Sequence, residues 1–203
     1  MNAVNEAWFA MDDLHQPELL ARLQHKIDNK TKPLGSLGRL EQLAIQLGLI
    51  LGTESPRLSQ AQMLVCAGDH GIVKHGVSAF PSDVTWQMVE NFLAGGAAVS
   101  VLARQHGIAL NVIDCGVNHD FTPRPGLIIR KVAYCTADSL QVPAMSAEQC
   151  QQAIDQGRDI VKNLPGNAVL LGEMGIGNTS AAALLLARLG DLDIADCTGA
   201  GTG

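Results

Sequence analysis

Four short, mainly apolar runs alternate along this chain with segments of helical periodicity, and this alternation constrains the fold more than any other feature. A strand that is covered on both faces is a continuous apolar run, whereas a half-exposed strand alternates. Strands that alternate with helices build a parallel sheet with helices on both faces. We therefore predict an α/β fold, a Rossmann-like three-layer arrangement, with strands over residues 63–67, 109–114, 127–133 and 168–171.

Apolar residues recur at helical spacing in five segments. These are residues 17–28, 39–51, 83–106, 146–164 and 178–190. The first two precede every predicted strand, so we expect a small helical lobe and linker over residues 1–58 and an α/β nucleotide-binding core over residues 59–203. The helix that should follow the last glycine-rich turn is missing, so we expect an N-terminal portion of a longer protein.

Local residues mark where the predicted helices begin and end. Ser146 suits an N-cap, and Glu148 follows it in the first turn, where a carboxylate is favourable. Gly190 is placed as a C-terminal stop. The pair Gly95-Gly96 leaves two alternatives for residues 83–106: one helix, or two helices that meet at the pair.

Charge and composition exclude several classes of partner. The net charge is −6 and no basic block occurs, which argues against a nucleic-acid partner. No apolar stretch approaches the roughly 20 residues of a membrane-spanning helix. The five cysteines include no CxxC, so we expect no metal site and interpret them as reduced, mostly buried thiols of a cytoplasmic protein.

Glycine-rich and polar residues follow the predicted strands, at the edge where parallel sheets bind ligands. The clearest example is GEMGIGNTS, residues 172–180. It matches neither the dinucleotide fingerprint nor the P-loop. Gly175 and Gly177 would let an anion approach the backbone at a helix N-terminus, where Asn178 and Thr179 add polar groups. The alternative is a tight turn whose glycines serve positive φ.

Four further motifs have both a structural and a functional interpretation. Glu173 is either a ligand contact or a solvated carboxylate, and the Asp69-His70 pair is either acid–base chemistry or a structural loop. The glycine-rich turn over residues 198–203 follows an apparent strand start and suits close approach to phosphate or ribose. Gln87 and Met88 fall near a helix start that would line a pocket, although core packing is the better explanation for most apolar residues there.

Taken together, KTKPLGSLGRLEQLA, AGDHGIVKHGVSAFPSDVTWQMVENFLAGGAAVSVLAR, DCGV, GEMGIGNTSAAAL and TGAGTG resemble the nicotinate-nucleotide:dimethylbenzimidazole phosphoribosyltransferase family. The resemblance covers nearly the whole chain in collinear order. It implies a parallel α/β sheet with a small helical lobe, a homodimer, and no metal or other cofactor. It also implies transfer of the phosphoribosyl group of nicotinate mononucleotide to 5,6-dimethylbenzimidazole, giving α-ribazole 5′-phosphate and nicotinate on the route to cobalamin.

The resemblance also assigns site residues. Substrate-binding residues would be Met174, Gly175, Ile176, Gly177, Asn178, Thr179, Gly199, Gly201 and Gly203. Phe80, Gln87 and Met88 would line the benzimidazole pocket. Glu173 is a secondary candidate for the catalytic base, since the family's principal catalytic glutamate has no counterpart here. We therefore expect this chain alone to be inactive.

Two rival functions remain open at this point. The chain could be a non-catalytic nucleotide-binding module, which would bind without transfer. It could also be another α/β transferase or hydrolase that acts on a phosphorylated sugar through Asp69 and His70.

Overall fold

The computed structural model describes residues 13–202, which divide into two compact units between Leu58 and Ser59. The first unit consists of helices α1 (Pro17–Asp28) and α2 (Arg39–Ile50). Leu19, Leu23 and Ile27 form the buried stripe of α1, as their helical spacing predicts. The two helices lie close together because α2 presents a glycine, Gly48, at the point where a Cβ would lie 2.6 Å from Leu23 Cδ2.

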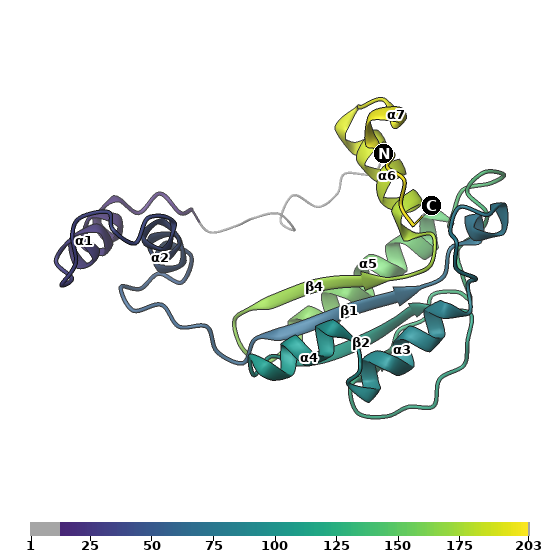
Figure 1. Cartoon of the computed structure of the whole chain (residues 1–203), viewed down its shortest axis with the longest axis horizontal. Coiled ribbons are helices and arrows are strands. Elements are labelled where there is room, and N and C mark those ends of the chain that lie inside the picture. Colours follow the sequence, from purple (N-terminus) through teal and green to yellow (C-terminus); the bar gives the residue numbers. More distant parts are fainter. Residues whose placement is uncertain (1–12, 203) are drawn as a thin grey trace. The chain divides into compact units, whose positions relative to one another are not determined.

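The second unit is built on a four-stranded parallel sheet with the order β3-β2-β1-β4 (Figure 1). The α/β class is confirmed, and all four predicted strands are present. The third strand ends at Ile129, earlier than predicted, and a loop follows it. The strands are β1 (Gln62–Gly68), β2 (Ala109–Gly116), β3 (Leu127–Ile129) and β4 (Val169–Met174).

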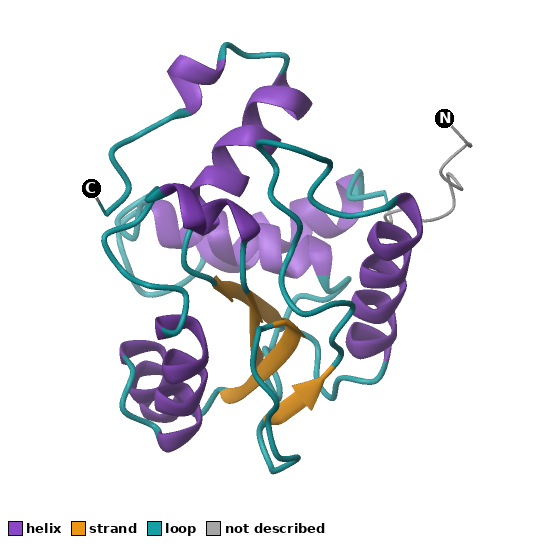
Figure 2. Ribbon diagram, turned by 90° about the vertical axis from the view of Figure 1, so that its right-hand side faces the viewer, coloured by secondary structure: helices purple, strands orange, loops and turns teal. Residues whose placement is uncertain are grey.

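Helices connect β1 to β2 and β3 to β4, a loop connects β2 to β3, and two further helices follow β4 (Figure 2). The alternative with two helices at Gly95-Gly96 is correct, because Gly95 takes φ +81° and ends the first of them. The N-cap prediction is confirmed, since Ser146 and Gln149 form a reciprocal capping box. The helices are η2 (Gly71–His75, 3₁₀), α3 (Val84–Ala94), α4 (Ala98–Gln105), α5 (Ala147–Lys162), α6 (Asn178–Gly190) and α7 (Ile194–Cys197).

Two details near the end of the chain differ from expectation. The residue that adopts the left-handed conformation after α6 is Asp191, with φ +52°, whereas Gly190 is still helical. The segment before the last glycine-rich turn is the short helix α7 rather than the start of a strand. The Asp193 side chain caps α7 by accepting a hydrogen bond from the Ala195 N–H, which favours a helical turn there.

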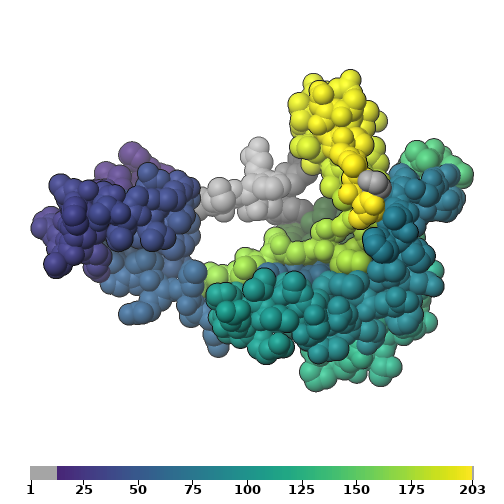
Figure 3. Space-filling view, viewed as in Figure 1, coloured from purple at the N-terminus to yellow at the C-terminus, as the bar shows by residue number. Residues whose placement is uncertain are grey.

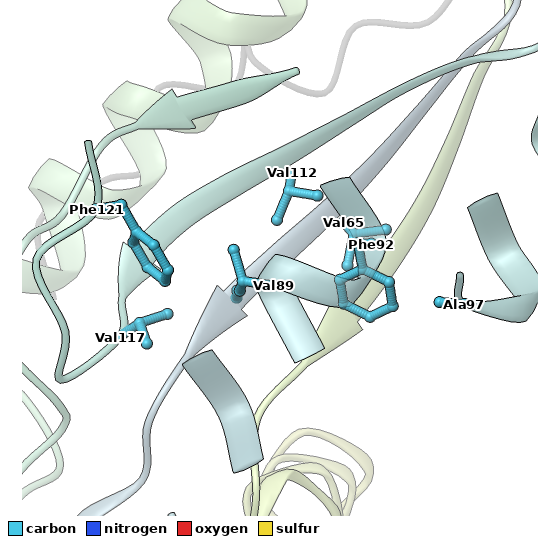
Figure 4. Packing of buried hydrophobic residues seen from close by; sticks show 8 residues of the cluster. Val65, Val89, Phe92, Ala97, Val112, Val117 and Phe121 are labelled. Carbon is cyan, nitrogen blue, oxygen red and sulfur yellow. The ribbon is translucent and has the colours of Figure 1, made fainter. Parts of the chain in front are cut away.

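Side chains from alternate positions of each strand pack on opposite faces of the sheet. One face packs under α3 and α4, where Val65, Val112, Val89 and Phe92 belong to the main core cluster (Figure 4). The other face packs under α5, through a smaller cluster that includes Ile160. Parallel sheets need cover on both faces, which this arrangement provides over the central strands.

Helices cover β4, one of the two edge strands, less completely. Leu171 of β4 is 74% exposed, and among the described residues α6 contributes no buried side chain. The prediction that the cysteines are mostly buried is wrong: four are half-buried and Cys150 is exposed, because several lie at the thinly covered strand ends or on helix surfaces. All five are free thiols. No helix within residues 13–202 is long and apolar enough to cross a membrane.

Candidate functional site

Three segments that are far apart in sequence meet at the carboxyl edge of β1 and β4. The Ile176 N–H, in the loop after β4, donates to Thr85 Oγ1 in the first turn of α3 at 3.1 Å. Ser78 Oγ lies 3.2 Å from Thr202 Oγ1, which joins the segment before α3 to the C-terminal turn. A Cβ on Gly201 would lie 3.3 Å from Thr179 Oγ1. Figure 3 shows the yellow C-terminal turn against the blue segment that follows β1.

Close packing accounts for the two central glycines of the loop after β4. A Cβ on Gly175 would lie 2.1 Å from the carbonyl oxygen of Gly68. Gly177 has φ +85°, and a Cβ there would lie 2.7 Å from Val73 Cγ2. Both glycines are therefore required by the contact between this loop and the segment after β1, whether or not a ligand is bound.

Polar groups of this loop gather at the start of α6. Glu173 lies on the α5 face of β4 and accepts hydrogen bonds from Asn178 Nδ2 at 2.6 and 2.8 Å, one to each carboxylate oxygen. Asn178 Oδ1 in turn accepts from the Thr179 N–H at 2.9 Å. Met174 points to the opposite face and packs against the main core cluster. The helix N-terminus and the Thr179 side chain thus face solvent beside an oriented carboxylate.

Asp69 joins two loops at the carboxyl edge of the sheet. Its side chain is buried, with only 4% of the residue exposed. Oδ1 accepts from Ser82 Oγ at 2.9 Å, and Oδ2 accepts from the Asn118 N–H at 2.8 Å. Both oxygens are therefore engaged in joining the segment before α3 to the loop after β2. These bonds give Asp69 a structural role, and the chemical role that the rival hypothesis gives it stays a prediction.

His70 lies between the loop after β4 and a large cavity. A Cβ on Gly175 would lie 3.0 Å from His70 Nε2, so the imidazole packs against this loop. Burial lowers the pKa of His70, although the nearby Glu173 and Asp69 carboxylates act in the opposite direction. The imidazole is therefore predominantly neutral at pH 7.

The cavity has a volume of about 680 Å³ and opens on the α5 side of the sheet. None of the site residues that the family resemblance assigns lines it, but Asp69 and His70, the candidates of the rival hypothesis, both do. Its walls come from the ends of β1 and β2, from the loop over residues 132–146, and from α5. The volume lies in the range of small-molecule pockets, roughly 300–1,000 Å³.

The loop that walls the cavity is tied to the sheet edge. The Thr136 N–H donates to the Asp69 carbonyl oxygen at 3.1 Å, and the Cys135 N–H donates to that of Gly116 at 3.0 Å. Asp138 binds His75 Nε2 at 2.9 Å and Lys74 Nζ at 3.0 Å. The hydrogen bond from His75 and that from Lys74 lower the pKa of Asp138 to about 2.

The residues predicted for the base pocket do not line the 680 Å³ cavity. Phe80 is 52% exposed, Gln87 is exposed, and Met88 packs against the main core cluster from α3. Gly199 and Gly201 belong to the C-terminal turn, and Gly203 lies outside the described residues. Phe80, Gln87 and Met88 remain candidates for one wall of a slot.

Sequence reasoning misses Thr85, Ser78 and the cavity loop. Thr85 is fully buried and its hydroxyl anchors the loop after β4, yet a threonine in the first turn of a helix carries no special signal. The loop over residues 132–146 has no periodicity to reveal it. Among residues 13–202, no three histidine, cysteine, aspartate or glutamate side chains are grouped to hold a metal ion.

Comparison with known proteins gives consistent matches. Residues 14–203 match a family described as phosphoribosyltransferase. Relatives that carry the name nicotinate-nucleotide--dimethylbenzimidazole phosphoribosyltransferase include proteins of Variovorax paradoxus and Aromatoleum aromaticum. The protein of Variovorax paradoxus is 66% identical over all 203 residues, which cover 58% of its length. That of Aromatoleum aromaticum is 57% identical over 193 residues, covering 94% of this chain and 56% of its own.

A solved structure agrees with the fold. The crystal structure of the correspondingly named enzyme of Thermus thermophilus superposes with a TM-score of 0.83 at 42% identity. The superposition covers 87% of this chain and 55% of that chain. The chain thus spans between half and two thirds of the length of these proteins.

Proposed function

Because this chain belongs to the phosphoribosyltransferase family that matches residues 14–203, we propose that it binds a phosphoribosyl donor at the carboxyl edge of its sheet. The names of its relatives point to nicotinate mononucleotide as the donor and 5,6-dimethylbenzimidazole as the acceptor. The products of that transfer are α-ribazole 5′-phosphate and nicotinate. The whole reaction belongs to cobalamin synthesis.

One observation carries the proposal: the loop after β4, the C-terminal turn and the segment before α3 meet at a single edge. The N-terminus of α6 lies there, and a helix N-terminus attracts a phosphate through its dipole and its free N–H groups. Thr179 and the backbone around Gly201 lie within contact distance of each other. A phosphate at this point would be held by the backbone N–H groups at the start of α6 and by the Thr179 hydroxyl.

Transfer requires substitution at the anomeric carbon of the ribose. The site must anchor the phosphate, orient the ribose, hold a flat apolar base and accept its proton. Asn178 orients Glu173 at the edge of the site. In that position Glu173 would accept hydrogen bonds from the ribose hydroxyls and, as a secondary role, the proton of the incoming base. Phe80, Gln87 and Met88 are proposed for the wall of the base slot.

A second candidate function is nucleotide binding without transfer. Glu173, near the end of β4, is already engaged by Asn178, which favours a positioning role over proton transfer. The two candidate functions share the binding site and differ only in turnover. A single experiment, which measures both binding and nicotinate release, separates them.

The experiment mixes the purified chain with nicotinate mononucleotide and measures binding by calorimetry, then adds dimethylbenzimidazole and measures nicotinate release by chromatography. Binding with acceptor-dependent release supports the transferase. Binding without release supports the nucleotide-binding module. Absence of binding by the wild-type chain contradicts both.

Variants locate the site within the same assay. Thr179→Val should weaken nucleotide binding by about 1–3 kcal/mol if its hydroxyl meets the phosphate. Glu173→Gln should weaken binding if the carboxylate faces the ribose. Thr53→Val, a matched change in the helical unit, should leave binding unaltered. Equal affinity for all three variants would remove the loop after β4 from the site.

We also propose that the protein is a homodimer of the cytoplasm. The free state of all five cysteines supports a reducing compartment. Light scattering at micromolar concentration tests the assembly, and a monomer would reject the dimer without affecting the binding proposal.

A further inference from the structure

Thr85 is a fully buried threonine in the first turn of α3, where a polar side chain needs a hydrogen-bond partner. Its Oγ1 accepts a hydrogen bond from the Ile176 N–H, in the loop after β4, at 3.1 Å. The two residues are 91 positions apart in the sequence. The bond therefore joins two elements that only the fold brings together.

The core fixes the position of the Thr85 hydroxyl. Residues four apart lie on the same face of a helix, so Thr85 shares its face of α3 with Val89. Val89 is fully buried and belongs to the main core cluster. The rotation of the Thr85 side chain is also restricted, because the residue is branched at Cβ. The hydroxyl is thus an acceptor that the helix and its packing hold in place.

Three kinds of contact place the loop around Ile176. The hydrogen bond from the Asn178 N–H to the Gly175 carbonyl oxygen, at 3.0 Å, shapes the turn into α6. The close packing of Gly175 and Gly177 sets how near the loop lies to the segment after β1. The bond to Thr85, between these two buried glycines, adds the tie to α3.

Thr85 thereby connects the two halves of the proposed site. On one side, Ile176 leads into the start of α6, where the phosphate is proposed to bind. On the other side, Gln87 and Met88 follow Thr85 within one turn of α3 and are proposed for the wall of the base slot. Transfer depends on the spacing of these halves, since a misplacement of about 1 Å costs on the order of 100-fold in rate.

We propose that Thr85 is a positioning residue, whose hydroxyl holds the loop after β4 so that the N-terminus of α6 faces the phosphate of the nucleotide. This role rests on the proposed function, because it requires a nucleotide at that edge. Without the hydroxyl, the partly buried Ile176 N–H would have no acceptor, which is unfavourable. The loop would then move to expose this N–H to water, and the start of α6 would move with it.

Calorimetry with nicotinate mononucleotide tests the role of the hydroxyl. Thr85→Val keeps nearly the same shape but removes the acceptor, and it should weaken binding about tenfold. Thr85→Ser keeps the hydroxyl and should bind like the wild type. The matched control Ser100→Ala removes another buried hydroxyl, which donates to the Phe92 carbonyl oxygen at 2.9 Å. This control should lower the urea midpoint without changing the affinity for the nucleotide.

A second measurement, made without ligand, reports on the loop itself. In Thr85→Val, the Ile176 amide should exchange with deuterium about tenfold faster than in the wild type, as read by NMR. This change should exceed any change at the Val112 amide in β2, which would report general destabilisation. Thr85→Ser should keep the exchange rate of the wild type.

The outcomes separate the role of Thr85 from the proposed function. Equal affinity of the wild type and Thr85→Val overturns the role of Thr85 and leaves the binding site standing. A loss of affinity in Thr85→Ser or in Ser100→Ala as large as that in Thr85→Val does the same, and so does an unchanged exchange rate of the Ile176 amide. Absence of binding by the wild type instead rejects the nucleotide site, and with it any role of Thr85 there.

Discussion

Asp69 offers the sharpest test of how the carboxyl edge of the sheet is held. Its two oxygens accept from Ser82 Oγ and from the Asn118 N–H, and its side chain is buried. A hydrogen bond to a charged acceptor contributes about 1.5–3 kcal/mol, so Asp69→Ala removes two such bonds. Because Asn118 itself is exposed, the low end applies, and we expect a loss of about 3 kcal/mol in the free energy of unfolding.

The isosteric change Asp69→Asn should cost far less. The amide oxygen can still accept from the Asn118 N–H, and the amide nitrogen can donate to Ser82, whose hydroxyl rotates to accept. Only the charge assistance is lost, so we expect a cost of about 1 kcal/mol. The exposed Asp159→Asn serves as a matched control and should stay within about 0.5 kcal/mol of the wild type.

Urea unfolding followed by fluorescence of Trp86, which packs against the main core cluster, measures these differences. With a slope of about 2 kcal/mol per molar urea, the midpoint of Asp69→Ala should fall by roughly 1.5 M. An Asp69→Ala midpoint within about 0.5 M of the wild type, at an unchanged slope of about 2 kcal/mol per molar, would refute the structural role. Equal losses for Asp69→Ala and Asp69→Asn would instead show that the charge, and not the pattern of acceptors, matters.

Three further predictions concern the same edge. Cys135 has φ +74°, so Cys135→Gly should relieve left-handed strain and stabilise the chain by about 0.5–1 kcal/mol in urea unfolding; a loss would contradict this. Gly175→Ala should destabilise by at least about 1–3 kcal/mol through its clash with a backbone oxygen, whereas Gly199→Ala, with nothing within 4 Å, should not change the midpoint. The pKa of Asp138 is about 2, below its value in the unfolded chain. The stabilisation that Asp138 gives the folded state is therefore complete above about pH 4 and lost as the pH falls through about 2. The melting temperature of Asp138→Asn should accordingly fall less than that of the wild type over this pH range.

The central strands of the sheet could be predicted because a strand that is buried on both faces is a continuous apolar run in the sequence. The runs that become β1 and β2 are apolar since helices cover both faces of these central strands, whereas β4 is apolar although it is largely exposed. The contact between Ile176 and Thr85 was not predictable in the same way. It depends on β4 lying next to β1, and a strand order of 3-2-1-4 is not encoded in the runs themselves.

The cavity wall escaped prediction for a different reason. Its position rests on backbone hydrogen bonds from Cys135 and Thr136 to the sheet edge, and backbone groups are the same in every residue. Cys135 also adopts a left-handed conformation that its residue type disfavours. Cys66, Cys115 and Cys135 are half-exposed because they line cavities, which composition does not reveal.

The parallel pairing of β1 with both β2 and β4 has a consequence for synthesis on the ribosome. Gln62 of β1 pairs with Ala109 and with Val169, so its second partner is made 107 residues later. At about 5–20 residues per second, β1 waits roughly 5–20 s with one side unpaired. Contacts of such long range also slow folding, because the loop must close before the pairing contributes. The nascent chain therefore exposes an apolar strand for seconds, and this interval is when chaperones would meet it.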